Sequence, residues 1–145
     1  MPHIKKDAWV NYSAEQMYRL VNRIEDYPQF LPWCHDTQVS ERDEQHVTAK
    51  IDVQKGGFHK SFTTRVVLMP NSKMELHLID GPFREFLGIW QFNGQDEKSC
   101  HISFALNFTF THRLLGMVAG PVFSHIANTM VEAFAERAED VYGQH

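Results

Sequence analysis

Histidine and cysteine are the residue types of this chain with the greatest capacity for chemistry, and their spacing argues against metal binding and nucleophilic catalysis. The nine histidines include no HxxxH, HxH or HxxEH pair, the patterns that place two side chains on one metal ion. Neighbouring side chains in an extended Cys34-His35-Asp36 segment point to opposite faces, which does not favour a nucleophile–base pair. Cys34 and Cys100 lack CxxC spacing, so we expect free thiols in a reducing compartment. We expect no metal site and no catalytic residue.

Other catalytic motifs are also missing. The chain contains no GxSxG elbow, no Walker loop and no GxGxxG turn. The acidic pairs Glu25-Asp26 and Glu139-Asp140 fit solvated helix faces or ends better than acid–base catalysis. Thr64 is the main polar residue expected on an apolar face, where either a ligand or a core hydrogen bond would satisfy its hydroxyl.

The charge balance limits the classes of partner. The chain has 14 basic and 18 acidic residues and a formal charge of −4, which argues against a general nucleic-acid surface and against DNA as a partner. Lys55 and Lys60 nevertheless cluster at one expected hairpin, and Arg19 and Arg23 add charge near the first expected helix. These four residues are the candidates for a positioned phosphate contact, such as one with ribosomal RNA.

Aromatic residues are the compositional outlier, with 11 Phe, 3 Trp and 4 Tyr in 145 residues. Such a set fills a plain packed core or lines a pocket for an apolar ligand, and composition alone does not decide between the two. The residues that we expect to line such a pocket are Phe62, Thr64, Val66, Phe86, Trp90, Phe92, Phe104, Leu106, Phe108, Met130 and Phe134.

The first elements that would position these residues are a strand and two short helices. A strand is expected over residues 3–11, followed by a helix with Ser13 as N-cap and Gln16 completing a capping box. Tyr27-Pro28 should end this helix, because the residue before a proline is pushed out of the α region. Pro28 can then open a second helix that continues through Leu31.

Alternating apolar residues predict the strands that follow. A weak strand is expected over 37–40, a clear one over 47–54, and others around 62–68, 74–78, 86–92 and 102–110. Gly56-Gly57 suits a tight hairpin between the second and third of these strands, and Gly88 is a candidate for a bend. The helical pattern then covers residues 124–142. Since a proline inside a helix costs about 3 kcal/mol, Pro121 favours a separate turn or gate over residues 113–120.

Together these elements predict one α+β domain over residues 1–145. The chain shows no signal peptide, and no apolar stretch approaches the roughly 20 residues that span a bilayer. We therefore expect a soluble, cytoplasmic protein.

Several segments also resemble one known family. The segment Tyr27-Pro28-Gln29-Phe30-Leu31-Pro32-Trp33-Cys34 closely resembles the signature after the first helix in the coenzyme Q-binding branch of START-like proteins. Asp80-Gly81-Pro82-Phe83, Trp90-Gln91-Phe92, the 104–110 strand and Ala133–Ala138 with Tyr142 follow in the family's order. Val10–Tyr18 and Phe62–Arg65 are most similar to the members of this family that associate with ribosomes.

This resemblance implies a helix-grip fold, in which a curved antiparallel sheet of about seven strands surrounds a long C-terminal helix. It implies two non-catalytic roles. One is binding of a polyprenyl quinone such as ubiquinone, or a similar lipid, in support of respiration, a role compatible with transient membrane contact. The other is binding to the large ribosomal subunit, which blocks subunit association. No catalytic residue carries over from the family, since its signature consists of turn, packing and cavity positions.

Overall fold

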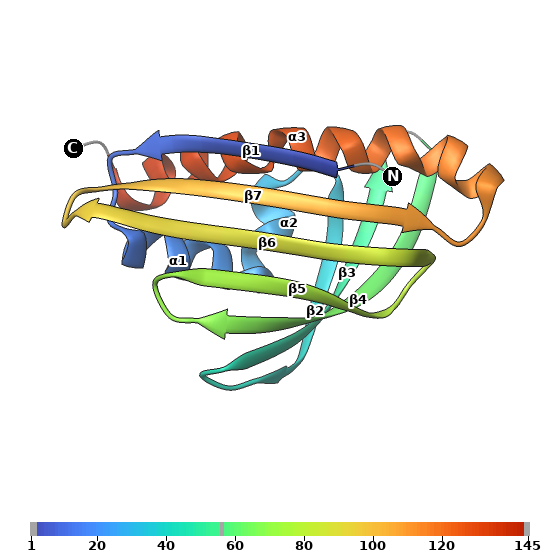
Figure 1. Ribbon diagram of the computed structural model, residues 1–145, viewed down its shortest axis with the longest axis horizontal. Helices are drawn as coiled ribbons and strands as arrows, with labels where there is room; N and C mark the ends of the chain where they lie inside the picture. The colour runs from blue at the N-terminus through green and yellow to red at the C-terminus, as the bar shows by residue number, and fades with distance from the viewer. Residues whose placement is uncertain (1–2, 56, 144–145) are drawn as a thin grey trace.

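Seven strands form one antiparallel sheet, and a long C-terminal helix lies along one face of it (Figure 1). The computed structural model describes residues 3–55 and 57–143. Its elements are β1 (His3–Val10), α1 (Ala14–Asn22), a 3-10 turn η1 (Ile24–Asp26), α2 (Tyr27–Phe30), β2 (Cys34–Arg42), β3 (His46–Lys55), β4 (Phe58–Met69), β5 (Lys73–Asp80), β6 (Phe83–Asp96), β7 (Ser99–Phe110) and α3 (Arg113–Tyr142). The order and number of strands, the two short helices and the long closing helix confirm the predicted α+β, helix-grip fold.

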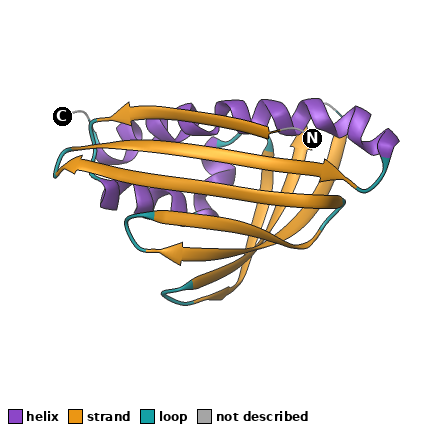
Figure 2. Ribbon diagram, in the orientation of Figure 1, coloured by secondary structure: helices purple, strands orange, loops and turns teal. Residues whose placement is uncertain are grey.

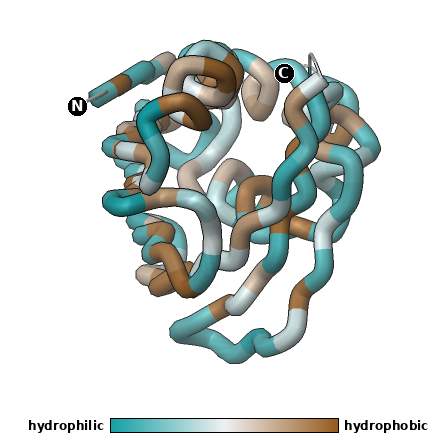
Figure 3. Tube along the Cα trace, turned by 90° about the vertical axis from the view of Figure 1, so that its right-hand side faces the viewer, coloured by the Kyte–Doolittle hydropathy of each residue, from teal (hydrophilic) through white to brown (hydrophobic). Residues whose placement is uncertain are grey.

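The sheet follows the chain from β2 to β7, and β1 then pairs with β7 at one edge. The strand order is β1-β7-β6-β5-β4-β3-β2, and every neighbouring pair is antiparallel. Figure 2 shows the helices gathered on one side of the strands. The end-on view in Figure 3 shows that the sheet curls around that side. The curled face is where side chains from distant strands and α3 meet.

Strand alternation fixes which side chains reach this interior. In β7, Ile102, Phe104, Leu106, Phe108 and Phe110 are all buried, whereas their neighbours on the opposite face are mostly half-buried. The same period of two buries Val47, Ala49, Ile51 and Val53 in β3. The predicted inward faces of these two strands are therefore confirmed.

The start of α1 matches the prediction, whereas its end does not. The Ser13 hydroxyl accepts a hydrogen bond from the Gln16 backbone at 3.0 Å, and the Ser13 backbone donates to the Gln16 side chain at 2.9 Å. The helix ends at Asn22 rather than at Tyr27, because the Arg23 N–H donates to the Leu20 carbonyl and the chain tightens into η1. Tyr27 instead begins α2.

Residues 113–120 belong to α3, so the predicted separate turn or gate before Pro121 is wrong. The helix runs from Arg113 to Tyr142 with Pro121 inside it. Pro121 has no N–H to donate to the carbonyl of Met117, four residues earlier. Both residues are exposed, so water can satisfy that carbonyl and the helix continues.

The remaining differences concern strand ends and one hairpin. The weak strand predicted over 37–40 is the longer β2, with register shifts at Cys34/Asp36 and Val39/Glu41. Gly57 adopts a φ of 84°, as a tight hairpin requires, whereas Gly56 lies outside the described residues. Gly88 is buried between neighbouring strands, and an added Cβ would lie 3.3 Å from Leu76 Cβ and 3.5 Å from Phe104 Cε1. The missing side chain of Gly88 leaves room for those of Leu76 and Phe104 beside it.

Candidate functional site

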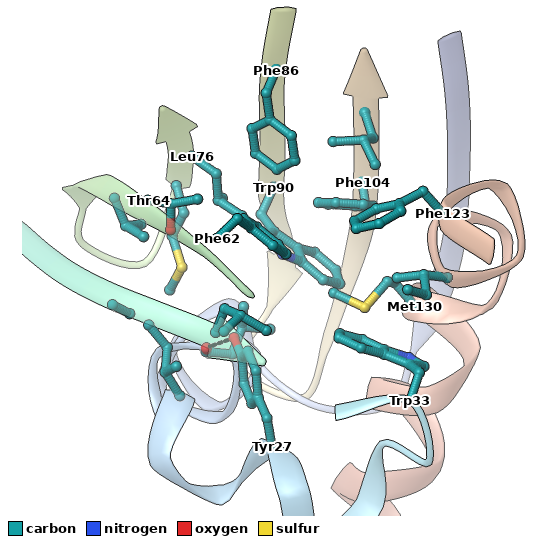
Figure 4. Close-up of a pocket in the computed structure, with 18 residues that line it drawn as sticks. Tyr27, Trp33, Phe62, Thr64, Leu76, Phe86, Trp90, Phe104, Phe123 and Met130 are labelled. Carbon is teal, nitrogen blue, oxygen red and sulfur yellow. Dashed lines mark hydrogen bonds between the residues drawn. The ribbon is translucent and has the colours of Figure 1, made fainter. Parts of the chain in front are cut away.

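An apolar cavity of about 70 Å³ lies between the sheet, the α1–α2 region and α3 (Figure 4). Every strand from β3 to β7 contributes to its wall, and so do α1, η1, α2 and α3. The lining residues are Val21, Ile24, Tyr27, Trp33, Ala49, Ile51, Phe62, Thr64, Val66, Met74, Leu76, Phe86, Trp90, Phe104, Leu106, Phe123, Ile126 and Met130.

Most of the residues that the sequence suggested for a pocket lie around this cavity. Eight of them line it: Phe62, Thr64, Val66, Phe86, Trp90, Phe104, Leu106 and Met130. Seven of the eight are strand residues on the inward face, and Met130 faces them from α3 (Figure 4). The other three expected residues, Phe92, Phe108 and Phe134, are absent from the lining.

These three phenylalanines pack behind the cavity wall and hold it in place. The Phe134 ring lies 5.3 Å from the Trp90 ring and 5.3 Å from the Tyr27 ring, so it supports two lining residues from behind. The Phe92 ring lies 5.7 Å from Tyr18, and the Phe108 ring lies 6.0 Å from Phe123. Alternation predicts which face of a strand a side chain lies on, but not whether that side chain lines the cavity or packs in the solid core. Residues of one inward face are therefore found in both places.

Ten lining residues were missing from the set expected at the pocket. The sequence could have identified four of them, because they lie on strand faces that the alternation predicts to be inward: Ala49, Ile51, Met74 and Leu76. Phe123 lies just before the expected start of the closing helix. The others are Val21, Ile24, Tyr27, Trp33 and Ile126. Tyr27 and Trp33 belong to the proline-rich segment, where no periodic pattern predicts which side chains point inward.

Polar groups are scarce in the cavity wall. Thr64 has only 2% of its surface exposed, and its side chain forms no hydrogen bond with any residue in the described ranges. The Tyr27 hydroxyl is engaged, since it donates to the Val21 carbonyl, and burial raises the pKa of this phenol well above its ordinary value. None of the lining residues is Asp, Glu, His, Lys, Arg or Cys. The wall therefore has no group suited to proton transfer near neutral pH.

The histidines and cysteines lie away from this cavity. Among residues 3–55 and 57–143, no three His, Cys, Asp or Glu side chains gather as a metal site would require; His145 lies outside these ranges. Cys34 and Cys100 are buried free thiols. Burial raises the pKa of Cys34 to about 12, with Asp36 and Asp52 adding to the effect, and raises that of Cys100 to about 11. Neither thiol is an activated nucleophile.

The four basic candidates do not form one patch. Lys55 and Lys60 lie at the β3–β4 hairpin, where Phe58 packs 5.8 Å from Phe123 of α3. Arg19 lies on α1, whose Gln16 carbonyl accepts a hydrogen bond from Tyr142 near the end of α3. The stretch of α3 from Phe123 to Tyr142 is about 28 Å long at the rise of an α-helix. Arg19 and its neighbour Arg23 are therefore remote from the lysines, and Arg19 is also paired with Glu15 at 2.5 Å.

α3 has an unusual distribution of apolar residues. Among the described residues, α3 is the one helix whose length and composition would allow it to cross a membrane. Core helices of soluble proteins meet the same two criteria. Phe123, Ile126, Met130 and Phe134 are buried against the sheet. In contrast, Leu114, Met117 and Val118 in the first turns are 78%, 70% and 64% exposed. Figure 3 looks at this end of the molecule.

The comparisons with known proteins agree with this fold. The family described as polyketide cyclase / dehydrase and lipid transport matches residues 10–135. The Escherichia coli protein named ribosome association toxin RatA is 45% identical over 142 residues, covering 98% of this chain and 90% of that protein. The Dictyostelium discoideum protein named coenzyme Q-binding protein COQ10, mitochondrial, is 26% identical over 138 residues, covering 92% of this chain and 67% of that protein.

A solved structure shows the same fold with little sequence similarity. The START superfamily protein from Mycobacterium smegmatis matches with a TM-score of 0.76 at 19% identity, covering 96% of this chain and 98% of that chain. The family match spans most of the chain, and the RatA similarity is high over nearly its full length. The chain therefore belongs to the polyketide cyclase / dehydrase and lipid transport family, with the START-like fold.

Proposed function

We propose that this protein is a non-enzymatic binding protein whose cavity takes a polyprenyl quinone, such as ubiquinone, or a similar lipid in support of respiration. The observation that carries the proposal is the apolar cavity between the sheet and α3, with Thr64 as its one unpaired hydroxyl among the described residues. Ligand sites of this kind are mostly hydrophobic, with a few polar groups that fix orientation. The name of the Dictyostelium relative supports the choice of quinone as ligand.

The wall of the cavity favours binding over catalysis. A cyclase or aromatase activity would need an acid or base beside the ligand. The only phenol among the lining residues, Tyr27, has a pKa raised by burial and donates a hydrogen bond to the Val21 carbonyl. A binding protein needs neither group, so the same wall suits storage or transfer of a ligand.

The size of the cavity and the surface of α3 suggest how such a ligand is collected. A volume of about 70 Å³ holds only a small part of such a ligand, so most of a polyprenyl chain must lie outside it. Such ligands reside in the bilayer. Leu114, Met117 and Val118 recur at helical spacing and present an exposed apolar face on the helix that also carries Phe123. Transient contact of this face with a membrane is part of the proposal.

Ligand extraction tests the proposal. Purified protein, before and after incubation with added quinone, is extracted with organic solvent, and the extract is separated with detection of quinone absorbance. The proposal predicts a quinone peak that scales with the amount of protein. Extracts without any bound species in repeated preparations, with and without added quinone, would overturn it.

Ribosome association is a second candidate, supported by the name of the Escherichia coli relative and by the exposed Lys55 and Lys60 at the β3–β4 hairpin. A contact with ribosomal RNA through these lysines would weaken with salt, because phosphate contacts release counterions. The candidate predicts cosedimentation with the large subunit at low salt, loss of binding in a Lys55→Ala/Lys60→Ala variant, and inhibition of subunit association. Arg19→Ala/Arg23→Ala is the matched control, since Arg19 on the remote α1 and Arg23 directly after this helix lie far from the lysines. Protein found only at the top of the gradient at low salt would exclude this role.

A further inference from the structure

Thr64 occupies an unusual position in the sheet. It lies in the middle of β4 on the inward face, where its Cα partners are Ala49 of β3 and Leu78 of β5. Phe62 and Val66 precede and follow it on the same face. The small side chain of Ala49 leaves space beside the hydroxyl, so Thr64 faces the cavity (Figure 4).

The hydroxyl of Thr64 lacks a partner in a place where a partner is needed. The residue is 98% buried, and its hydroxyl forms no hydrogen bond with the described residues. Unlike the Thr109 oxygen, the Thr64 oxygen is not fully enclosed by protein atoms, so it stays open to the cavity. An unpaired buried hydroxyl destabilises a protein, because folding removes it from water without replacing the lost hydrogen bond. A sheet position of this kind would be filled better by valine, which has the same shape and higher strand propensity. The hydroxyl therefore has a use that the ligand-free fold does not show.

The other polar atoms of the wall indicate what the partner carries. The indole N–H groups of Trp33 and Trp90 also make no hydrogen bond to the described residues, and both side chains are more than nine-tenths buried. An indole N–H is only a donor, whereas a threonine hydroxyl both donates and accepts. Among these groups, the Thr64 hydroxyl is the one that the geometry places toward the cavity. A ligand group that accepts a hydrogen bond, such as a carbonyl oxygen, complements this hydroxyl.

The exposure of the lining residues indicates where the cavity opens. Most are buried, but Phe62, Leu76 and Phe86 on β4, β5 and β6 are half-buried. The paired register of β5 with β6 ends at His77 and Leu87, so the two strands are not paired beyond this point, beside Phe86. The Phe62 and Phe86 rings lie 5.4 Å apart at this opening.

We propose that the ligand enters the cavity ring first, that Thr64 donates a hydrogen bond to a carbonyl oxygen of the ring, and that the apolar tail leaves past Phe62 and Phe86. This inference rests on the proposed function and adds the orientation of the ligand and the residue that recognises its head. The reverse orientation, with the tail inside, would leave the Thr64 hydroxyl covered by hydrocarbon and without a partner.

Two substitutions and two ligands test the orientation. The ligands are a benzoquinone with a decyl tail and decylbenzene, which has a similar shape but no carbonyl oxygen. Binding of both is measured to wild type, Thr64→Val and Thr64→Ser. We expect Thr64→Val to weaken quinone binding about five- to tenfold, as loss of one neutral hydrogen bond does. We expect Thr64→Ser to bind within about twofold of wild type, and decylbenzene to bind wild type and Thr64→Val equally.

Thermal unfolding of the ligand-free variants separates recognition from a structural role. Since Thr64→Val removes an unpaired hydroxyl at nearly constant volume, it should raise the Tm of the ligand-free protein while weakening the quinone complex. A lowered Tm with unchanged quinone affinity would overturn the inference. The infrared carbonyl stretch of quinone bound to wild type requires no variant, and it should lie below its position in hexane. A stretch at the hexane position would also overturn the inference.

The outcomes distinguish this inference from the function on which it rests. Quinone binding to wild type that Thr64→Val leaves unchanged overturns the ring-first orientation and leaves the binding function standing. Absence of quinone binding to wild type overturns both.

Discussion

The ring of Phe62 on β4 lies 5.8 Å from the ring of Phe123 on α3, at an interplanar angle of 61°. Both residues line the cavity, so this contact joins the sheet to the helix at the wall of the proposed site. Phe123 also lies 5.2 Å from Phe83 and 5.6 Å from Phe110. One side chain of α3 therefore connects three strands to the helix.

Substitution of Phe123 by alanine should be strongly destabilising. Phe123 is 3% exposed, and removal of a buried phenylalanine ring costs about 3–5 kcal/mol through lost burial and the space left behind. Urea unfolding followed by circular dichroism measures the change. Leu114→Ala on the same helix is the control, because Leu114 is 78% exposed and its loss should change the free energy of unfolding by at most about 0.5 kcal/mol. Similar losses for the two variants would contradict the placement of α3.

Replacement of Pro121 should stabilise the helix that the sequence suggested would break there. Pro121→Ala restores a backbone donor inside α3 at an exposed position, and we expect a gain of about 1–3 kcal/mol in the free energy of unfolding. Gly120→Ala provides a comparison, since an added Cβ meets nothing within 4 Å and should contribute about 0.5–1 kcal/mol. If Pro121→Ala destabilises the protein in urea unfolding, residues 113–120 are not part of a continuous helix.

The buried thiols predict a loss of stability at alkaline pH. In the folded protein burial raises the pKa of Cys34 from 9.0 to about 12 and that of Cys100 from 9.0 to about 11. The folded state therefore holds both protons after the unfolded chain has released them. Their contribution to stability is complete below pH 9 and is lost as the pH rises toward about 11 and above.

Urea unfolding midpoints across this alkaline range measure the effect. The Cys34→Ala/Cys100→Ala variant should lose less stability than wild type between pH 9 and pH 11, because it lacks both thiols. Tyr27 also has a pKa raised by burial and remains in both proteins, so the difference between them isolates the cysteines. Parallel pH profiles for the two proteins would show that the thiols are not buried in the native state.

The apolar face at the start of α3 predicts membrane binding. Replacement of Leu114, Met117 and Val118 by serine should reduce cosedimentation with lipid vesicles several-fold without loss of folding, because all three side chains are exposed. Trp9→Ser is the control, since Trp9 is 64% exposed on β1, away from α3's first turns. Equal binding by wild type and the triple variant would remove this face from the proposal.

The sequence predicted the layers of the fold because strand and helix periods are local properties. Phe104, Leu106 and Phe108 alternate with polar residues, and all three are buried as expected. Alternation does not report depth, so it did not separate Phe104 and Leu106, which line the cavity, from Phe108, which packs beside Phe123. That separation depends on how the sheet curls and where α3 lies, and both are set by contacts between distant segments.

Local rules also failed where tertiary contacts or water offset a local penalty. Tyr27 was expected to end a helix, yet it begins α2, and its hydroxyl reaches back to the Val21 carbonyl. Pro121 was expected to break the helix, but solvent can satisfy the carbonyl of Met117 that it leaves unpaired. Thr64 was identified as an inward polar residue, and the structure adds that it has no protein partner in the described ranges.

Tryptophan fluorescence tests the existence of the ligand site most directly. Trp33 and Trp90 line the cavity, whereas Trp9 is exposed, so a Trp9→Phe protein reports on the cavity alone. Titration with the decyl quinone should quench this emission to saturation. Adding Ala49→Leu should abolish the quenching by filling the cavity, at a cost to stability of about 1–3 kcal/mol, whereas Ala105→Leu on the opposite face of the sheet should leave it intact. Quenching that is absent in the Trp9→Phe protein, or equal in the Ala49→Leu variant, would contradict the assignment of this cavity as a ligand site.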